Sequence, residues 1–400
     1  DTPDPGHTGV GTQTLLPRGL VRACERAAVN EKNTHLDVTT RVWPIISDSE
    51  IADVLGHLEH PLAGTPLTVS NRPTTAGILV DVGPRTVFIK RHGPRTVPAD
   101  HLRAVHGLVA HVRDRGIPTP ALLRFADHDT LWETPAGTWE VYEGAQGEDR
   151  YRDAPTWTVP RTLDEARALG AMTARLAIAS ADYRARRNPA CAYQSSMHLF
   201  ASDPRRDLPR WLAERPGVRA YLAHSGRRIE DQWAPHLQFA ASYADIAPRL
   251  PVAWTHGDLH VSNVFWDGNH PSQVIDFGLA DRNPAVYDLA LAIERNAFEW
   301  TRIVDGDEDA VRADVTLALI EGYEEIRPLS PDERRGLVAM MPLVQAEAGL
   351  NWIEYQYGAT RSLHGADWCL DIFFGEHTRW FTRPSGRDYL AWLDDALTHD

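Results

Sequence analysis

Hydrophobic and polar positions follow two different periods along the chain. Between residues 51 and 143, short β-branched and aromatic runs such as PLTVS, GILVDVG and RTVFIKRH alternate with turn signals such as Arg72-Pro73. Runs of this kind are typical of β-strands. From about residue 160 the apolar positions mostly recur at the spacing of amphipathic helices. The pattern predicts a small strand-rich part followed by a larger helical part.

One helix and one hairpin are expected within the strand-rich part. The segment DHLRAVHGLVAHVRDRG carries apolar residues at helical spacing, and Gly116 ends it. Its apolar face consists of Leu102, Val105, Leu108, Val109 and Val112. The runs TLWET and TWEVYE predict a hairpin around Pro135-Ala136-Gly137. The segment GAQG at 144–147 is then the joint to the helical part.

The helical part has three features of its own. Glu165 follows Thr162 by three positions, which predicts a capping box at the start of a helix. One long helix is expected over RRGLVAMMPLVQAEAGLNWIEYQYG, at 334–358. Two short β-like runs, NVFWD and SQVIDFG, interrupt the helices and are close enough in sequence to pair with each other.

Composition and charge limit the classes of protein that fit. The chain has 400 residues, of which 43% are hydrophobic, as in a folded protein of two or three domains or lobes. A net charge of −14 argues against nucleic acid and anionic membranes as partners. An acidic surface attracts a cationic ligand or only aids solubility, and both readings stay open here. No apolar run reaches the ~18 residues of a membrane helix.

The cysteines and the N-terminus indicate a compartment. Cys24, Cys191 and Cys369 are odd in number and far apart, which argues against a disulfide framework and for a reducing environment. The polar start DTPDPGHTGVGTQ lacks a signal-peptide pattern. We therefore expect a cytoplasmic protein, as a monomer or a homodimer.

Lysine is rare in this chain, which draws attention to one of its two lysines. The two are Lys32 and Lys90, and Lys90 ends the strand-like run TVFIK. A compact ammonium can sit between phosphate oxygens as a point charge, which a planar guanidinium does less well. Lys90 is therefore a candidate phosphate-binding residue, the alternative being a strand-end lysine that reaches solvent.

The stretch WTHGDLHVSNVFWDG, at 254–268, and the later IDFG carry the strongest chemical signal. Asp258 and Asn263 precede the first β-like run, and Asp276 follows the second. A hairpin would bring Asn263 and Asp276 together near Asp258. Two oxygen ligands suit Mg²⁺, which keeps few protein ligands, and leave Asp258 free to accept a proton. Metal, phosphate and base together indicate phosphoryl transfer.

HGDLHVSN followed by IDFG resembles the aminoglycoside phosphotransferase and choline kinase-like family, which has a protein-kinase-like fold. The resemblance runs from about residue 66 to the C-terminus. It implies an α+β protein with two lobes. A small antiparallel β-sheet lobe with one helix would occupy 51–143, and a larger, mostly helical lobe 144–400. Residues 1–50 would be a partly helical extension.

The resemblance also implies roles for individual residues. Asp258 would be the catalytic base. Asn263 and Asp276 would hold Mg²⁺ beside the nucleotide. Lys90 would contact the α- and β-phosphates of ATP, or of GTP.

The nucleotide site would extend into the strand-rich lobe. Ser70 to Gly77 would form the phosphate loop, although Gly77 is its single glycine in place of a GxGxxG pattern. Backbone groups around Glu140 to Glu143, those of Val141 and Glu143 among them, would bind the adenine edge.

A second departure from the family concerns the partner of Lys90. The helix after this lysine usually supplies a pairing glutamate, and DHLRAVHGLVAHVRDRG contains none. His106 lies near the expected position and is the candidate replacement.

Further residues would support the catalytic loop. His256 would pack under Phe277. Asp288 would accept backbone N–H bonds from the loop, or would be an ordinary aspartate at a helix start. His260 belongs to the motif, and a contact with the substrate is one reading of it.

Candidates for the acceptor side come from the C-terminal helices. One face of the expected long helix carries Leu343, Glu347, Leu350 and Glu354. Glu347 then lies at the edge of an apolar stripe or faces a polar cavity that holds the acceptor. Tyr355 belongs to an aromatic cluster that forms core or lines an acceptor pocket.

The combined reading is an ATP- and Mg²⁺-dependent O-phosphotransferase that acts on a small-molecule hydroxyl. The acceptor would be an aminoglycoside-like or other antibiotic, which would make the protein a resistance enzyme, or a biosynthetic intermediate. The alternatives are a primary-metabolism kinase for homoserine, an amino alcohol or a sugar, and a nucleotide-binding pseudokinase. A protein kinase fits less well, because IDFGLADRNPAVYDLALAIE leaves no room for an activation segment.

Overall fold

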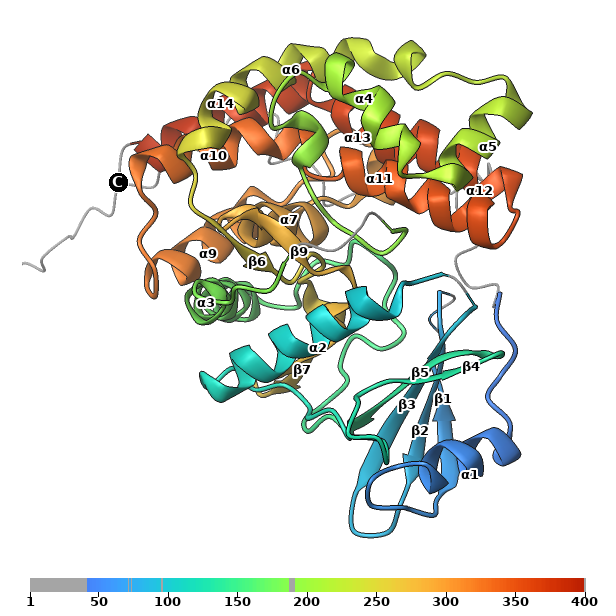
Figure 1. Ribbon diagram of the computed structural model, residues 1–400. Helices are drawn as coiled ribbons and strands as arrows, with labels where there is room; N and C mark the ends of the chain where they lie inside the picture. The colour runs from blue at the N-terminus through green and yellow to red at the C-terminus, as the bar shows by residue number, and fades with distance from the viewer. Residues whose placement is uncertain (1–41, 71, 73, 95, 187–190, 399–400) are drawn as a thin grey trace, which may run out of the picture.

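The computed structural model describes residues 42–398 apart from 71, 73, 95 and 187–190, and it has two lobes (Figure 1). The smaller lobe is a β-sheet with helices beside it, and the larger lobe is mainly helical. This arrangement confirms the two-lobed α+β fold expected from the sequence. Residues 1–41, most of the expected extension, lie outside the described residues.

The small lobe is built on a five-stranded antiparallel sheet with the order β1-β2-β3-β5-β4. Its strands are β1 (Thr65–Val69), β2 (Ala76–Asp81), β3 (Thr86–His92), β4 (Trp132–Thr134) and β5 (Gly137–Glu143). β4 and β5 form the predicted hairpin. β3 and β5 pair Lys90 directly with Glu140, so these two side chains share one face of the sheet.

Helix α1 (Asp48–Gly56) is a second helix of the small lobe, which the sequence analysis did not expect. Ser47 caps it in a capping box with Glu50. Three apolar side chains of the helix join the core of the sheet: Ile51, Val54 and Leu55. The boundary expected at residue 51 therefore falls inside a helix that packs on this lobe.

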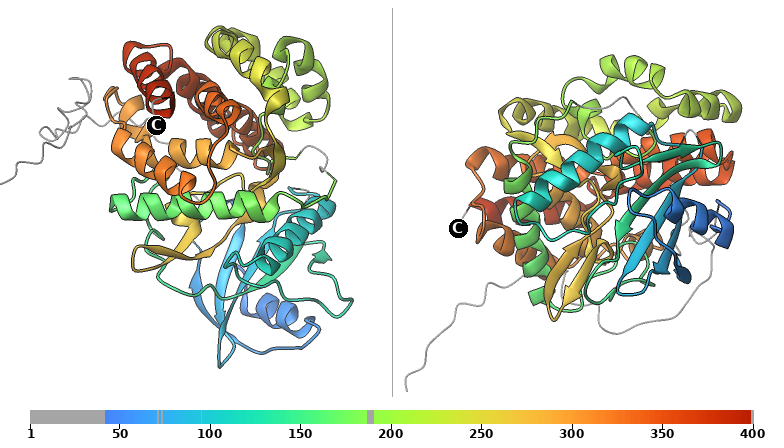
Figure 2. Two further views of the ribbon diagram at one scale, coloured as in Figure 1. Left: turned by 90° about the vertical axis from the view of Figure 1, so that its left-hand side faces the viewer. Right: turned by 60° about the horizontal axis from the view of Figure 1, so that its bottom comes forward.

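Helix α2 (Ala99–Asp114) lies between the sheet and the helical lobe (Figures 1 and 2). Its predicted apolar face is buried. Four of these side chains belong to the core of the large lobe: Val105, Leu108, Val109 and Val112. Gly116 follows the helix with a φ of 86°, which favours glycine. Because α2 packs on the large lobe, it ties the two lobes together.

Three helices form the centre of the large lobe: α3 (Leu163–Ser180), α7 (Tyr287–Ala297) and α9 (Ala313–Glu324). α3 and α9 touch at two glycines. A Cβ on Gly170 would lie 2.0 Å from the carbonyl O of Leu319, and a Cβ on Gly322 would lie 1.9 Å from that of Arg167. Any side chain at either position would force the two helices apart.

The start of α3 departs from one prediction. Thr162 caps the helix by accepting a hydrogen bond from Glu165 N, as expected. The carboxylate of Glu165 does not close the box. It accepts instead from Arg161 N, at 2.9 Å, and from the hydroxyl of Tyr151. Glu165 therefore fixes the segment before the helix rather than the cap itself.

The outer helices cover the side of the large lobe that is remote from the sheet (Figure 1). They include α4 (Pro204–Ala213), α5 (Pro216–Ser225), α6 (Trp233–Ile246), α8 (Trp300–Val304), α10 (Pro331–Met340), α11 (Ala346–Ile353), α12 (Leu363–Trp368), α13 (His377–Trp380) and α14 (Pro384–Thr398). The single long helix expected over 334–358 was wrong. A 3₁₀ turn with Pro342 separates α10 from α11, and the π-helical segment Glu354–Ala359 follows. Pro342 cannot donate the backbone hydrogen bond that a continuous helix needs.

Two short antiparallel ladders hold the central loops. β6 (Val252–Thr255) pairs with β9 (Asp281–Pro284), and β7 (Val264–Asp267) pairs with β8 (His270–Val274) as predicted. Together they hold the ends of the loop at 256–263 and of the segment at 275–280. Among the described helices, none is long and apolar enough to cross a membrane.

Candidate active site

The loop that carries Asp258 is pinned by an aspartate from a helix. Asp288, in the first turn of α7, accepts hydrogen bonds from His256 N at 2.7 Å and from Gly257 N at 2.9 Å. Gly257 has a φ of 79°, and a Cβ there would lie 2.4 Å from the carbonyl O of Leu279. Only glycine meets both conditions without strain. The contacts expected of Asp288 are present, and they fix the backbone just before Asp258.

His256 braces the same loop from below. Its ring centroid lies 4.5 Å from that of Phe277. Nε2 donates to the carbonyl O of Ile275 at 2.9 Å, and Nδ1 accepts from Asp258 N at 3.2 Å. Both ring nitrogens are thereby used, which leaves His256 a structural position and no proton to exchange with a substrate.

Asp258 and Asn263 are in direct contact. The side-chain Nδ2 of Asn263 donates to the carbonyl O of Asp258 at 2.8 Å and to its Oδ2 at 3.1 Å. The Asp258 side chain is 21% exposed, so an acceptor molecule can reach it. The amide nitrogen of Asn263 faces Asp258. The amide oxygen, Asn263 Oδ1, is therefore the atom of this side chain that could bind a cation.

Arg295 is a site residue that the sequence analysis missed. Its Nη2 lies 3.2 Å from Asp258 Oδ1. Burial alone would raise the pKa of the Asp258 carboxyl, but Arg295 and His260 outweigh burial and hold this pKa far below its usual value. The signal in the sequence was the spacing of seven between Asp288 and Arg295, which places both on one side of α7.

The Arg295 guanidinium lies over Trp157, with Cζ 5.7 Å from the ring centroid. Trp157 has a φ of 62°, a left-handed conformation that costs a bulky residue about 1–3 kcal/mol. Trp157 also makes ring contacts with Trp368 and, at 5.3 Å, with Phe373. A cluster of three aromatic side chains, Trp157, Trp368 and Phe373, therefore lies next to Arg295, the residue that pairs with Asp258.

His260 is buried next to Asp258. Nε2 lies 3.6 Å from Asp258 Oδ2, and Nδ1 accepts from Ser262 N at 3.3 Å. Burial, reinforced by the charge of Arg295, lowers the pKa of His260 to about 4. The ring is therefore neutral at physiological pH, and its 5% exposure leaves little surface for a substrate.

Asp276 faces Asn263 across the base of the hairpin. Ile275 N donates to the carbonyl O of Asn263 at 3.0 Å, which brings the two expected metal ligands together. Asp276 has a left-handed backbone with φ 61°, and its side chain is 42% exposed. Desolvation would raise the pKa of Asp276, but the ammonium of Lys90 outweighs it and lowers this pKa. A carboxylate and an amide oxygen form a donor set that fits Mg²⁺.

Lys90 reaches across the lobe boundary. Its Nζ lies 2.9 Å from Asp276 Oδ1 and 3.9 Å from Glu140 Oε1. His106, the candidate replacement for the missing helix glutamate, does not contact Lys90 within the described residues. Its Nε2 contacts Glu140 Oε2 at 2.5 Å. The partner from the small lobe is therefore Glu140 of β5, which we expected only at the adenine edge.

The expected phosphate loop is described in part, because residues 71 and 73 lie outside the described ranges. Ser70 N donates to the carbonyl O of Gly77 at 2.9 Å, which closes the loop base. Gly77 lies in β2, opposite Lys90, rather than at the loop tip. A Cβ on Gly77 would lie 2.6 Å from Phe88 Cζ, so close packing in the sheet explains this glycine.

Three aromatic side chains hold the tip of that loop at the carbonyl O of Thr74. Trp43 Nε1 donates to it at 3.0 Å, the Tyr193 hydroxyl at 2.8 Å and the Tyr355 hydroxyl at 3.3 Å. Tyr355 is only 1% exposed. Tyr355 is therefore a core residue, the first of the two readings of its aromatic cluster, and it fastens the small lobe to the large one.

Two of the backbone groups expected near adenine already have partners in the protein. Glu143 N donates to the carbonyl O of Ala121 at 2.8 Å, and Leu123 N donates to the carbonyl O of Val141 at 2.8 Å. The Glu143 N–H cannot bond to a base while it holds this partner. In the joint that follows, Gly144 N and Gln146 N are likewise bonded, to Thr86 O and to Gln273 Oε1, each at 2.8 Å, so the position of the adenine edge stays a prediction.

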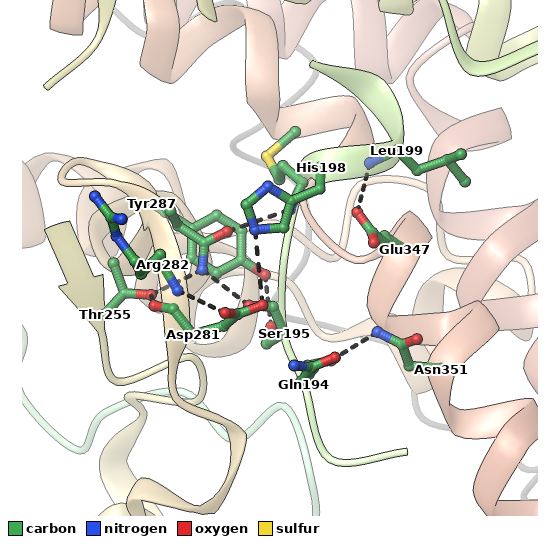
Figure 3. A network of polar contacts seen from close by, with 12 residues as sticks. Gln194, Ser195, His198, Leu199, Thr255, Asp281, Arg282, Tyr287, Glu347 and Asn351 are labelled. Carbon is green, nitrogen blue, oxygen red and sulfur yellow. Dashed lines mark hydrogen bonds and ion pairs between the residues drawn. The ribbon is translucent and has the colours of Figure 1, made fainter. Parts of the chain in front are cut away.

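Glu347 does not face an acceptor. Its side chain is fully buried and accepts from Leu199 N at 2.8 Å (Figure 3) and, outside that view, from Trp211 Nε1 at 2.9 Å. Both earlier readings, the stripe edge and the polar cavity, were wrong. A third role explains the residue: its carboxylate satisfies backbone and indole N–H groups of a neighbouring segment. Glu354, seven residues later, does the same for Val218 N.

Comparisons with known proteins agree with this geometry. The model of the phosphotransferase enzyme family matches residues 76–329, more than half of the chain. The homoserine kinase of Rhodospirillum rubrum is 28% identical over 284 residues, which cover 69% of this chain and 74% of that protein. The homoserine kinase of Methylobacterium nodulans is 30% identical over 283 residues, which cover 70% of this chain and 73% of that protein.

Solved structures share the fold at lower identity. A microcompartment-associated aminopropanol kinase has a TM-score of 0.56 at 16% identity, over 84% of this chain and 98% of that one. An amicoumacin kinase in complex with AMP-PNP, Ca²⁺ and Ami has a TM-score of 0.52 at 15% identity, over 81% of this chain and 92% of that one. With its catalytic-loop geometry and its family match taken together, the chain belongs to the phosphotransferase enzyme family and is a small-molecule kinase.

Proposed function

We propose that the protein transfers the γ-phosphoryl group of ATP to a hydroxyl of a small amino-bearing acceptor. The observation that carries the proposal is the contact of the Asn263 amide with the carbonyl O and Oδ2 of Asp258, beside the Lys90–Asp276 ion pair. This contact leaves one carboxylate for the acceptor hydroxyl. Asn263 Oδ1 and the Asp276 carboxylate are then available for a metal ion, and the Lys90 ammonium is available for the phosphates.

Asp258 is the proposed proton acceptor. The acceptor oxygen attacks the γ-phosphorus, the bond from that phosphorus to the bridging oxygen breaks, and ADP leaves with the electron pair. The hydroxyl proton passes to Asp258. Because Arg295 keeps the pKa of Asp258 low, the carboxylate is a weak base that orients the hydroxyl and receives its proton late.

Asn263 Oδ1 and the Asp276 carboxylate are the proposed ligands of Mg²⁺. The Asn263 amide is oriented by Asp258, and Asp276 is partly exposed toward the lobe boundary. When bound, Mg²⁺ would supply positive charge opposite the phosphate oxygens. Lys90 is the proposed contact for the α- and β-phosphates, and the hinge backbone at 141–147 for adenine.

Homoserine or a related amino alcohol is the first candidate acceptor. The support is the similarity to homoserine kinases at 28–30% identity over about 70% of this chain. The net charge of −14 suits an acceptor that carries an ammonium group.

A larger hydroxylated antibiotic is the second candidate. The observation that favours it is the aromatic group beside Arg295, in which Trp157 adopts a strained backbone next to Trp368 and Phe373. Such a group can stack on a ring that homoserine lacks.

One assay separates these candidates. The protein would be incubated with Mg²⁺-ATP and each acceptor singly: homoserine, 1-amino-2-propanol, choline, an aminoglycoside and a macrolide. Mass spectrometry would identify a phosphorylated acceptor. Product with homoserine or the amino alcohol supports the first candidate, and product only with an antibiotic supports the second. ADP formation that no acceptor stimulates would contradict both.

A further inference from the structure

The ammonium of Lys90 has two carboxylate neighbours from different lobes. Asp276 comes from the large lobe, at 2.9 Å, and Glu140 comes from β5 of the sheet, at 3.9 Å. Glu140 is the direct cross-strand partner of Lys90. The Glu140 side chain is 3% exposed and that of Lys90 14%, so little water screens this attraction.

Two histidines fix the Glu140 carboxylate. His92 Nε2 contacts Oε1 at 3.0 Å, and His106 Nε2 contacts Oε2 at 2.5 Å. The hydroxyl of Tyr142 also donates to Oε2, at 3.3 Å. Burial would raise the pKa of Glu140, but His92 and His106 outweigh it and hold the pKa well below its usual value. The carboxylate therefore stays charged and cannot swing away from its strand.

We propose that Glu140 is the positioning residue that holds Lys90 toward the phosphates of a bound nucleotide, in place of the glutamate that α2 lacks. This inference rests on the proposed nucleotide site. A metal on Asp276 would compete with Lys90 for the same carboxylate. Glu140 would then be the remaining anionic partner of the lysine among the described residues.

The position of Lys90 and Glu140 on adjacent strands differs from that of the corresponding pair in protein kinases. In protein kinases the lysine lies on a strand and its glutamate on a helix, so a shift of that helix breaks the pair. Here Lys90 and Glu140 lie on adjacent strands in fixed register. Helix α2 contributes through His106. The register of the pair is therefore set by the sheet, and a movement of α2 would reach Lys90 only indirectly, by way of the contact between His106 and Glu140.

Isothermal titration of ADP and of adenosine tests the proposal without turnover. Glu140→Gln keeps the shape of the side chain and removes its charge. Because Lys90 is the proposed phosphate contact, the ADP affinity should fall by about tenfold, which corresponds to about 1.4 kcal/mol. The adenosine affinity should stay unchanged. Lys90→Met should weaken ADP by at least as much as Glu140→Gln.

The scarcity of lysine gives a second readout. With only Lys32 and Lys90 in the chain, ¹⁵N-lysine labelling yields two ζ-ammonium signals. Glu140→Gln should shift the Lys90 signal of the nucleotide-free protein and leave the Lys32 signal in place. A Lys90 signal at the wild-type position would overturn the proposal.

Matched variants control for loss of folding. Glu333→Gln alters another carboxylate that is 3% exposed, at the start of α10, and should leave ADP binding unchanged. If Glu140→Gln does not fold, His106→Leu removes one donor to Glu140 and should weaken ADP binding. His106→Gln keeps a donor and should restore it.

Three outcomes distinguish a failure of the role proposed for Glu140 from a failure of the proposed nucleotide site. Wild-type ADP affinity in Glu140→Gln, with weak binding in Lys90→Met, would overturn the role of Glu140 alone. Wild-type ADP affinity in Lys90→Met would overturn the proposed nucleotide site itself. Equal losses for ADP and adenosine in Glu140→Gln would show general damage to the lobe and also reject a positioning role.

Discussion

Arg295 Nη2 lies 3.2 Å from Asp258 Oδ1, so a cation from α7 sits directly beside the proposed base. The same helix contributes Asp288, which binds the two backbone N–H groups just before Asp258. Two turns of one helix thus control both the backbone position and the charge of the catalytic loop. This coupling explains why the Asp258 carboxylate stays ionised although it is largely buried.

Arg295→Gln should move the acidic limb of the kcat/KM profile to higher pH. Arg295 lowers the pKa of Asp258, so its removal raises that pKa, and the carboxylate is then protonated at a higher pH than in the wild type. A shift of about 1–3 pH units is typical for loss of a close opposite charge. The measurement is kcat/KM between pH 3 and 8, where the wild type should stay level at the acidic end, because its Asp258 pKa lies far below the usual value, and Arg295→Gln should lose activity.

Arg302→Gln is the matched control for that profile. Arg302 lies on α8, is 45% exposed and pairs with Glu299 and Asp307. Its removal should leave the acidic limb in place. An unshifted profile in Arg295→Gln would contradict the assignment of this limb to Asp258.

Asp288→Ala should destabilise the protein as well as the loop. Two buried N–H groups, of His256 and Gly257, would lose their acceptor, at a cost of about 1–3 kcal/mol each. Urea unfolding measures the change. Asp314→Ala, at an aspartate that is 41% exposed near the start of α9, should cost less than about 1 kcal/mol. Equal losses for the two variants would argue against the bracing role of Asp288.

Tyr355→Phe should speed the release of nucleotide. The change removes one donor to the Thr74 carbonyl and keeps the ring, so the β1–β2 loop is held by Trp43 and Tyr193 alone. One neutral hydrogen bond is worth about 0.5–1.5 kcal/mol, which corresponds to a rise in the dissociation rate of about two- to tenfold. Stopped-flow release of a fluorescent ADP analogue provides the measurement.

Tyr389→Phe is the control for the loop. The Tyr389 hydroxyl contacts Thr316 in the core of the large lobe, and its loss should not alter nucleotide release. An unchanged rate in Tyr355→Phe would show that the contact with Thr74 does not restrain the loop.

The short-range parts of the site were predictable from the sequence. Asp258, Asn263 and Asp276 lie within a single loop and hairpin, so their spacing alone brings them together. Lys90 stood out because lysine is rare and because it ends a strand-like run.

The parts that depend on long-range packing were not predictable. Glu140 becomes the partner of Lys90 through the register of β3 and β5, which no local pattern reveals. Glu347 was assigned to a stripe edge or to a cavity because its partners, Leu199 N and Trp211, lie far away in the sequence. Tyr355 likewise contacts a loop of the other lobe.

Comparison of wild type with Asp258→Asn tests the central claim most directly. Turnover of Mg²⁺-ATP with the best acceptor from the panel would be followed by mass spectrometry, and ADP affinity by calorimetry. The account predicts a rate lower by about 10²–10⁴, the usual share of a positioned acid or base, with ADP affinity unchanged. Wild-type turnover by Asp258→Asn would contradict the account.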